Sequence, residues 1–332
     1  MAAEDPWKTR SDEEEADDLF FEEEGDQERK GKREEAQKEL TNAGMLLVSG
    51  SKWKTQLEET LNEACKDEAT LALDDTIFES VEKASKATCL VRRQKNSQSR
   101  LDYYKERGDE ERLKNAKKGK GGCGTGFLVH PRSILGWFVI TNNHVIMNEE
   151  EAESAEVIFD HSNDEHLPDK TKRIKVKQLV SKGIRTTDAE DFDNLDFSVL
   201  ALESEDEFLE KYAGECLFDE NDTKKIFTIL TSSVLNFVPI IAFSHPHGLG
   251  KRISIGKYPN EDKESEPVPK FHLRHQLPTA PGSSGANLIY PRPAGSDKFA
   301  LWDAAFVHYR HSLAVSWRVI APELRKDLSA AE

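Results

Sequence analysis

The sequence contains few cysteines, and they show no pairing pattern. Cys65, Cys89, Cys123 and Cys216 lie far apart, and none belongs to a CxxC pair. This spacing gives neither a disulfide framework nor a zinc-binding motif. We therefore expect four free thiols in a reducing compartment and no bound metal.

Long apolar runs are also lacking. No segment approaches the ~20 apolar residues that cross a bilayer. The first residues, MAAEDPWKTRSDEEEADD, have no basic flank, apolar run or small-residue cleavage site of the kind that marks a secretory signal. We expect an intracellular protein, cytoplasmic or nuclear, that is neither secreted nor bound to membranes.

Basic charge is in deficit, most of all at the beginning of the chain. The 332 residues carry a net charge of −16, and residues 1–40 hold 16 acidic and 7 basic side chains, a net of −9. A segment this polar contains few residues that could build a core. We therefore predict an acidic disordered tail over residues 1–40, or a loose charged helix. An acidic interaction tail is the functional alternative. The net charge argues against nucleic-acid binding, and the basic run 112–120 is predicted to be a solvated loop.

After the tail, the pattern of apolar residues changes from helical to strand-like. A spacing of four residues predicts a helix over 53–65, inside a helical linker at 41–74, and another helix over 76–86. Short runs typical of β-strands follow at 87–92, 124–130, 135–141, 155–160, 173–180, 195–202, 238–244, 252–256, 270–276, 286–290 and 299–308. Many short strands separated by polar loops indicate an all-β sandwich or barrel. A short helix is expected at 322–328.

Three motifs place reactive side chains in a fixed order. The first, GTGFLVHPRSILGWFVITNNHVI, carries His144 at the end of an apolar strand. The second, DNLDFSVLAL, puts Asp196 just before another strand, and the third, APGSSGAN, supplies Ser283 and Ser284. A serine hydroxyl needs a neighbouring base with a pKa near 7, which histidine provides, and a carboxylate fixes the histidine tautomer.

With these motifs the chain resembles the trypsin-like (chymotrypsin-fold, PA clan) serine peptidases, most closely the intracellular HtrA-like branch. The pattern is G-[TS]-G-F, then [LIV]-T-x-x-H-V, then D-[FIL]-[AS]-[VIL]-[VIL], then G-x-S-G. The resemblance implies a peptidase domain over 75–325 made of two antiparallel β-barrels, with the site in the cleft between them. Too little chain follows the second barrel for the PDZ domain that many HtrA proteins carry.

The resemblance also assigns roles to single residues. It implies His144 as the general base, Asp196 as its carboxylate partner and Ser284 as the nucleophile. The oxyanion hole would be formed by the backbone N–H groups of Gly282 and Ser284, and Ser283 would be structural. No metal or organic cofactor is implied.

Alternatives exist for some of these residues. Asp191 and Asp193 lie in the same acidic loop as Asp196 and could replace it. The stretch HPHGLGK, residues 245–251, could suggest a metal-binding pair, but its proline and glycines favour a turn between strands. Five further histidines are read as ordinary polar residues: His161, His166, His272, His275 and His311.

The α/β-hydrolase fold, the other common home of a catalytic serine, does not fit. Its nucleophile elbow needs G-x-S-x-G, and the second glycine position is Ala286.

Secreted trypsin-like enzymes carry an aspartate just before the nucleophile, and this aspartate receives the new N-terminus formed by zymogen cleavage. Here that residue is Ser283. No zymogen cleavage of that kind is expected, and the sequence leaves open whether the oxyanion hole is preformed or ordered by a partner.

The walls of the specificity pocket can be placed by the same resemblance. Pro278 stands six residues before Ser284, where an aspartate would select Arg or Lys. Thr279 and His308 match the residues that hold the substrate carboxylate in the glutamyl-endopeptidase branch. A hydroxyl and an imidazole can both donate to a carboxylate or amide oxygen. We therefore expect cleavage after Glu or Gln.

These observations predict a serine endopeptidase that acts on protein or peptide substrates through an acyl-enzyme. The alternative, from another class, is a catalytically silent peptidase-like domain that binds partners through its cleft or its acidic tail.

Overall fold

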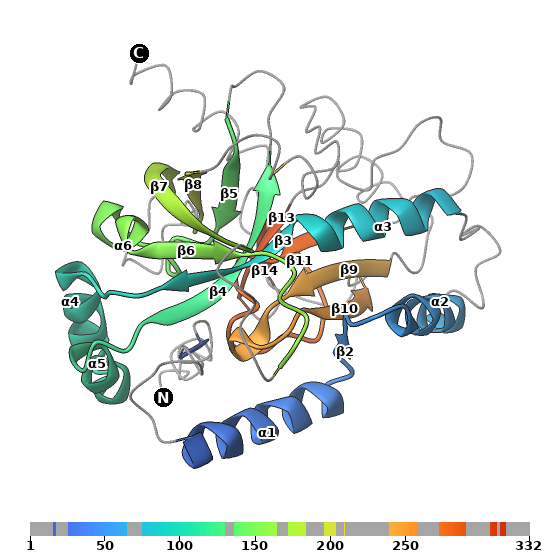
Figure 1. The fold of residues 1–332 in the computed structure, drawn as a ribbon, viewed down its shortest axis with the longest axis horizontal. Helices are drawn as coiled ribbons and strands as arrows, with labels where there is room; N and C mark the ends of the chain where they lie inside the picture. Colours follow the sequence, from blue (N-terminus) through green and yellow to red (C-terminus); the bar gives the residue numbers. More distant parts are fainter. Residues whose placement is uncertain are drawn as a thin grey trace, which may run out of the picture.

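The computed structural model describes residues 16–17, 26–64, 75–129, 136–164, 172–183, 196–203, 209, 239–257, 272–289, 306–310 and 313–316 (Figure 1). The helices are α1 (Asp26–Asn42), α2 (Lys52–Ala64), α3 (Asp75–Ala87), α4 (Gln98–Arg107), α5 (Glu110–Lys117), α6 (Glu149–Glu153) and the 3₁₀ turn η2 (Pro246–Gly248). The strands are β1 (Ala16–Asp17), β2 (Leu46–Leu47), β3 (Thr88–Arg93), β4 (Gly122–Val129), β5 (Phe138–Thr141), β6 (Ala155–Ile158), β7 (Arg173–Lys182), β8 (Ser198–Leu202), β9 (Pro239–Ser244), β10 (Arg252–Lys257), β11 (His272–Arg274), β12 (Asn287–Ile289), β13 (Phe306–Arg310) and β14 (Leu313–Ser316).

The first sheet closes into a barrel. Its order is β1-β4-β3-β6-β7-β8-β5, and β5 also pairs with β4, so that six antiparallel strands form a ring. The interior is crowded: a Cβ added at Gly126 would lie 2.6 Å from Val139 and 2.7 Å from Val91. Glycine in the GTGF run therefore lets β4 pass close to its neighbours.

The second sheet contains the serine motif. Its order is β11-β14-β13-β12-β9-β10-β2, and all its described pairings are antiparallel. Together with the first barrel it gives the expected all-β, two-sheet architecture. Each of the β runs expected from the sequence overlaps a described strand, whereas the helix expected at 322–328 lies outside the described residues.

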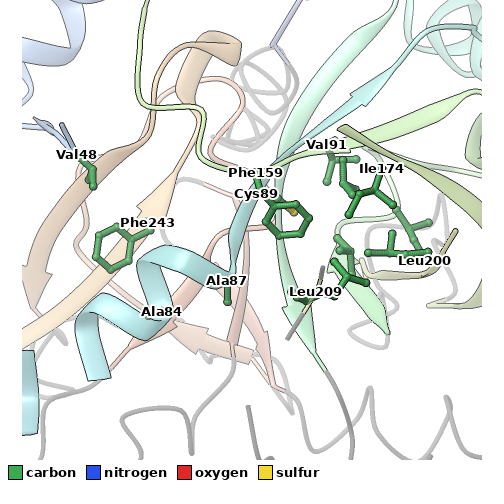
Figure 2. Packing of buried hydrophobic residues seen from close by; sticks show 14 of the residues in the cluster. Val48, Ala84, Ala87, Cys89, Val91, Phe159, Ile174, Leu200, Leu209 and Phe243 are labelled. Carbon is green, nitrogen blue, oxygen red and sulfur yellow. The ribbon is translucent and has the colours of Figure 1, made fainter. Parts of the chain in front are cut away.

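A single apolar core joins the two sheets. Helix α3 contacts β3 and β4 of the first sheet and β12 of the second. Figure 2 shows Phe243 of the second sheet on one side of α3, and Val91 and Leu200 of the barrel on the other. Trp53 of α2 meets Phe243 edge to face, with ring centroids 6.0 Å apart. The segment expected to be a helical linker is thus partly integrated into the core, since α2 buries Trp53, Leu57 and Leu61.

The structure describes two charged segments as helices. Residues 26–42 form helix α1, which buries Ala36 and Leu40, so that of the two interpretations of residues 1–40 the charged helix applies from residue 26 onward. Residues 110–117 form helix α5, capped by Asp109, where the basic run was expected to be a loop. In α1, two apolar side chains four residues apart are buried despite the high charge of the segment, whereas α5 buries Ala116 alone among its described side chains. Among the residues that the structure describes, no helix is long and apolar enough to cross a membrane.

Candidate active site

His144 and Asp196 are in direct contact. His144 Nδ1 lies 2.6 Å from Asp196 Oδ2, and the His144 backbone N–H donates to Asp196 Oδ1 at 2.9 Å. Both side chains are buried. A carboxylate that accepts from Nδ1–H fixes the imidazole tautomer with Nε2 available as a base.

Strand pairing explains why two residues so far apart in sequence meet. His144 follows the end of β5, Asp196 precedes the start of β8, and Thr141 of β5 is paired with Ser198 of β8. The asparagines before His144 hold the adjacent backbone. Asn142 Nδ2 donates to the Asp196 carbonyl at 2.5 Å, and Asn143 Nδ2 contacts Ser198 Oγ at 3.2 Å.

Ser284 lies on a tight turn that leads into β12. Ser283 N–H donates to the Ala280 carbonyl at 2.9 Å, and Gly282 has a φ of +89°, as the third residue of a type II turn requires. Ser283 Oγ accepts from Ala280 N–H at 3.3 Å and lies 3.4 Å from Ser244 Oγ, so it faces the supporting loops.

Thr125 of β4 binds this turn to the first barrel. Its N–H donates to the Ser284 carbonyl and its Oγ1 donates to the Gly282 carbonyl, both at 2.8 Å. Its own carbonyl accepts from Thr141 Oγ1 at 2.7 Å, three residues before His144. Sequence reasoning did not single out Thr125, although it stands in the GTGF motif.

Two glycines permit this close approach. A Cβ on Gly285 would lie 1.8 Å from the Thr125 carbonyl oxygen, and Gly285 also has a φ of +93°. A Cβ on Gly124 would lie 2.6 Å from a methyl of Val145, which follows His144, and 3.2 Å from the Ser284 carbonyl oxygen. The structure therefore brings the serine turn, the His144 loop and Asp196 together around β4 and β5.

A buried ion pair supports the loop that follows His144. Arg100 Nε and Glu151 Oε1 are 2.7 Å apart, as are Arg100 Nη2 and Glu151 Oε2, and both side chains are buried. The Val145 carbonyl accepts from Arg93 Nη1 at 2.7 Å, and Glu151 also accepts from the Met147 N–H at 2.9 Å. Burial raises the pKa of Glu151, but its contacts with Arg100 outweigh this and lower it to about 2. Sequence reasoning did not anticipate this pairing.

Breaking the ion pair should destabilise the protein. We expect Arg100→Met to lower the free energy of unfolding by about 3–5 kcal/mol, because Glu151 would remain buried without its partner. The double variant Arg100→Met/Glu151→Leu should recover most of this loss, and Lys86→Met, at an exposed pair with Glu82, should cost at most ~1 kcal/mol. Urea denaturation measures all three. Equal stability of wild type and Arg100→Met would refute the supporting role.

The other predicted site residues are placed as follows. Thr279 is half-buried and lies in the segment that leads to the serine turn. His308 is on β13, one residue from the pairing of Val307 with Asn287 of β12, and its side chain is outside the described part. Asp191 and Asp193 lie outside the described residues.

The histidine-rich stretch is a turn, as expected. Residues 246–248 form η2 between β9 and β10. His245 is stacked on His161 with ring centroids 5.6 Å apart. Burial lowers the pKa of His161 to about 4 and that of His245 well below its usual range.

Within the described ranges, no three His, Cys, Asp or Glu side chains are grouped to hold a metal. Cys89 is a free, buried thiol, Cys123 is buried in β4, and Cys65 and Cys216 are outside the described part.

A two-sheet β fold with a histidine–carboxylate pair beside a serine turn is the arrangement of a serine peptidase domain. Residues 124–291, half of the chain, match the trypsin-like peptidase domain family. The chain therefore belongs to the trypsin-like peptidases, as the sequence motifs predicted.

Individual relatives are distant or matched only in part. The uncharacterised protein y4fB of Sinorhizobium fredii (strain NBRC 101917 / NGR234) is 33% identical over 166 residues, which are 49% of this chain and 23% of that protein. The chain thus matches less than a quarter of this relative. The HtrA-type protease AlgW with a tripeptide is 12% identical, with a TM-score of 0.42, over 77% of this chain and 64% of that one. An inactive form of Rv3671c from M. tuberculosis H37Rv is 13% identical, with a TM-score of 0.38, over 78% and 96%.

Proposed function

We propose that the protein is a serine endopeptidase that hydrolyses peptide bonds through an acyl-enzyme, with His144, Asp196 and Ser284 as its triad. The observation that carries the proposal is the 2.6 Å contact between His144 Nδ1 and Asp196 Oδ2, beside a serine turn that is bound by Thr125 of the neighbouring strand β4. A histidine oriented in this way can act as the base that a serine nucleophile requires.

The proposed reaction has two halves. His144 Nε2 takes the proton of Ser284 Oγ as this oxygen attacks the scissile carbonyl, and then gives the proton to the leaving amine. In the second half, His144 activates a water that hydrolyses the ester and regenerates Ser284. Asp196 stays ionised and stabilises the imidazolium that forms in each half.

The negative oxygen of each tetrahedral intermediate needs donors that are already in place. We assign this role to the N–H groups of Gly282, in the central peptide of the serine turn, and of Ser284, which directly follows the turn. A donor of this kind is worth roughly 3–4 kcal/mol of transition-state stabilisation. No metal or organic cofactor takes part in the scheme.

For the residue before the scissile bond, we propose Glu or Gln. Thr279 lies in the segment before the serine turn, and β13, which carries His308, is paired with β12 directly after it. A hydroxyl and an imidazole converging from these two segments would bind a carboxylate or amide oxygen. The substrates would be proteins or peptides.

We also propose that the enzyme works in a reducing, intracellular compartment. Cys89 is a free thiol, and burial raises its pKa to about 12, so that it stays protonated. Free thiols of this kind are usual where disulfides do not form.

A peptide-library cleavage profile tests the activity and its specificity together. Wild type should cleave after Glu or Gln in preference to Lys, Arg or Phe, and Ser284→Ala should cleave nothing. His308→Ala should lower kcat/KM for the Glu peptide more than tenfold, a loss above ~1.4 kcal/mol. Cleavage after apolar or basic residues that His308→Ala leaves unaltered would remove the pocket assignment, whereas no cleavage at all would contradict the peptidase.

A further inference from the structure

The N-terminal helix α1 lies against the segment that precedes the nucleophile. Ala36, Leu40 and Met45 form one buried cluster with Leu249 and Ala280. Leu249 directly follows η2, and Ala280 is the first residue of the serine turn. Strand β2 continues from α1 and pairs with β10 at the edge of the second sheet (Figure 1). The helix is therefore packed against the structure that carries Ser284.

The turn itself can adopt two orientations of its central peptide. Proline at its second position suits type I and type II turns equally, and glycine at the third accepts either sign of φ. The two turn types differ by a flip of the Pro281–Gly282 peptide, which exchanges the places of its carbonyl and its N–H. The local sequence therefore permits both a donor and an acceptor at the oxyanion position.

A contact from the η2 loop selects one orientation. The His247 backbone N–H donates to the Pro281 carbonyl oxygen at 2.6 Å. Since the C=O and N–H of a trans peptide point in opposite directions, this bond turns the Gly282 N–H away from the η2 loop. Residues at the start of the same loop also hold the Gly282 carbonyl, through Thr125. The His245 N–H donates to Thr125 Oγ1 at 2.8 Å, and the Thr125 hydroxyl donates to the Gly282 carbonyl.

The η2 loop needs support, because its backbone is strained. His247 has a φ of +54°, in the left-handed region that a non-glycine residue enters at a cost of about 1 kcal/mol or more. Helix α1 provides contacts on this side: Glu39 Oε2 lies 3.2 Å from His247 Nε2, and Leu40 packs in the cluster that contains Leu249. These contacts hold His247 where its N–H meets Pro281.

We propose that α1 is an intramolecular positioning element for the oxyanion hole, which holds the η2 loop so that His247 fixes the Pro281–Gly282 peptide. This rests on the proposed peptidase function. Within one chain, α1 would supply the ordering of the oxyanion hole that the sequence left open to a partner. His247 is a positioning residue, since it acts through Gly282 and does not touch the substrate.

Point variants in α1 test the coupling. Leu40→Ala should lower kcat at least tenfold with KM within about twofold of wild type, because the donor acts in the transition state; complete loss of such a donor costs 10²–10³ in kcat. Lys38→Ala, at an exposed position of the same helix, should behave as wild type. Hydrogen exchange should become faster in both residues 26–42 and 245–249 of Leu40→Ala. Faster exchange in α1 with unchanged kcat would overturn the proposal.

Cutting the chain after folding avoids the possibility that Leu40→Ala fails to fold. Ala43 and Gly44 form an exposed turn between α1 and β2, which can accept an inserted protease site. Cleavage there followed by removal of the fragment should lower kcat at least tenfold, and adding back a peptide of residues 26–43 should restore it. An uncleavable insert of equal length, treated with the same protease, is the control. A nicked, fragment-free protein as active as the control would refute the positioning role, while an inactive uncut wild type would instead contradict the peptidase function.

Discussion

Ser284→Ala and His144→Ala are each expected to lose about 10⁶-fold in kcat on a peptide substrate. Triad members act as a unit, so removing one has nearly the effect of removing all of them. Ser283→Ala should stay within about tenfold of wild type, because the contacts that the described residues make with its hydroxyl, from Ala280 N–H and Ser244 Oγ, are long. Steady-state kinetics of the three variants measure this.

Covalent labelling separates an enzyme from a silent scaffold. A fluorophosphonate should label wild type and Ser283→Ala but not Ser284→Ala. Circular dichroism should show that all three proteins are equally folded. A correctly folded wild type that neither labels nor cleaves peptides would favour the binding-scaffold alternative, whereas a labelled Ser284→Ala would point to another nucleophile.

Much of the β architecture could be predicted because each strand has a local signature. Ile174 and Val176 of β7 are buried and alternate with exposed Lys175 and Lys177, as in a half-buried strand, although the alternation ends at Gln178, which is exposed. The order of strands within each sheet could not be predicted in this way. The closure of β5 onto β4, for example, depends on contacts between many residues that no short segment encodes.

The candidate site shows the same contrast between local motifs, which the sequence reveals, and long-range contacts, which it does not. The spacing of His144, Asp196 and Ser284 was visible because each stands in a motif, and the structure brings the first two into contact. The supporting contacts were not visible. Arg100 and Glu151 are 51 residues apart, and a charged residue on a short helix is normally solvated, so nothing in the sequence marks this buried pair.

Helix α1 shows how composition can mislead. Its average composition is strongly polar, and this is why a disordered tail or a loose charged helix was expected, with no packing against the core. Docking depends on only a few side chains: Ala36 and Leu40, four residues apart, lie on one face and meet Leu249 and Ala280. Average charge is insensitive to such a narrow apolar stripe.

The second large effect is expected at Asp196. In the structure, Asp196 Oδ1 accepts from the His144 backbone N–H, and Oδ2 lies 2.6 Å from His144 Nδ1. In Asp196→Asn the backbone N–H needs the remaining oxygen as its acceptor, so the new amide NH₂ faces Nδ1. The ring must then accept at Nδ1 and carry its proton on Nε2, where it can no longer take the proton of Ser284.

Asp196→Asn should therefore lose about 10⁴ in kcat, the factor found for the corresponding change in a well-studied serine protease. Asn is nearly isosteric with Asp, so the fold should be retained and thermal unfolding can check this. Asp193→Asn and Asp191→Asn are the matched controls, because both are the rival carboxylates of the same acidic loop, and both should keep near-wild-type rates. A crippled Asp193→Asn beside an active Asp196→Asn would transfer the role to Asp193, and the 2.6 Å contact with His144 would then be structural rather than catalytic.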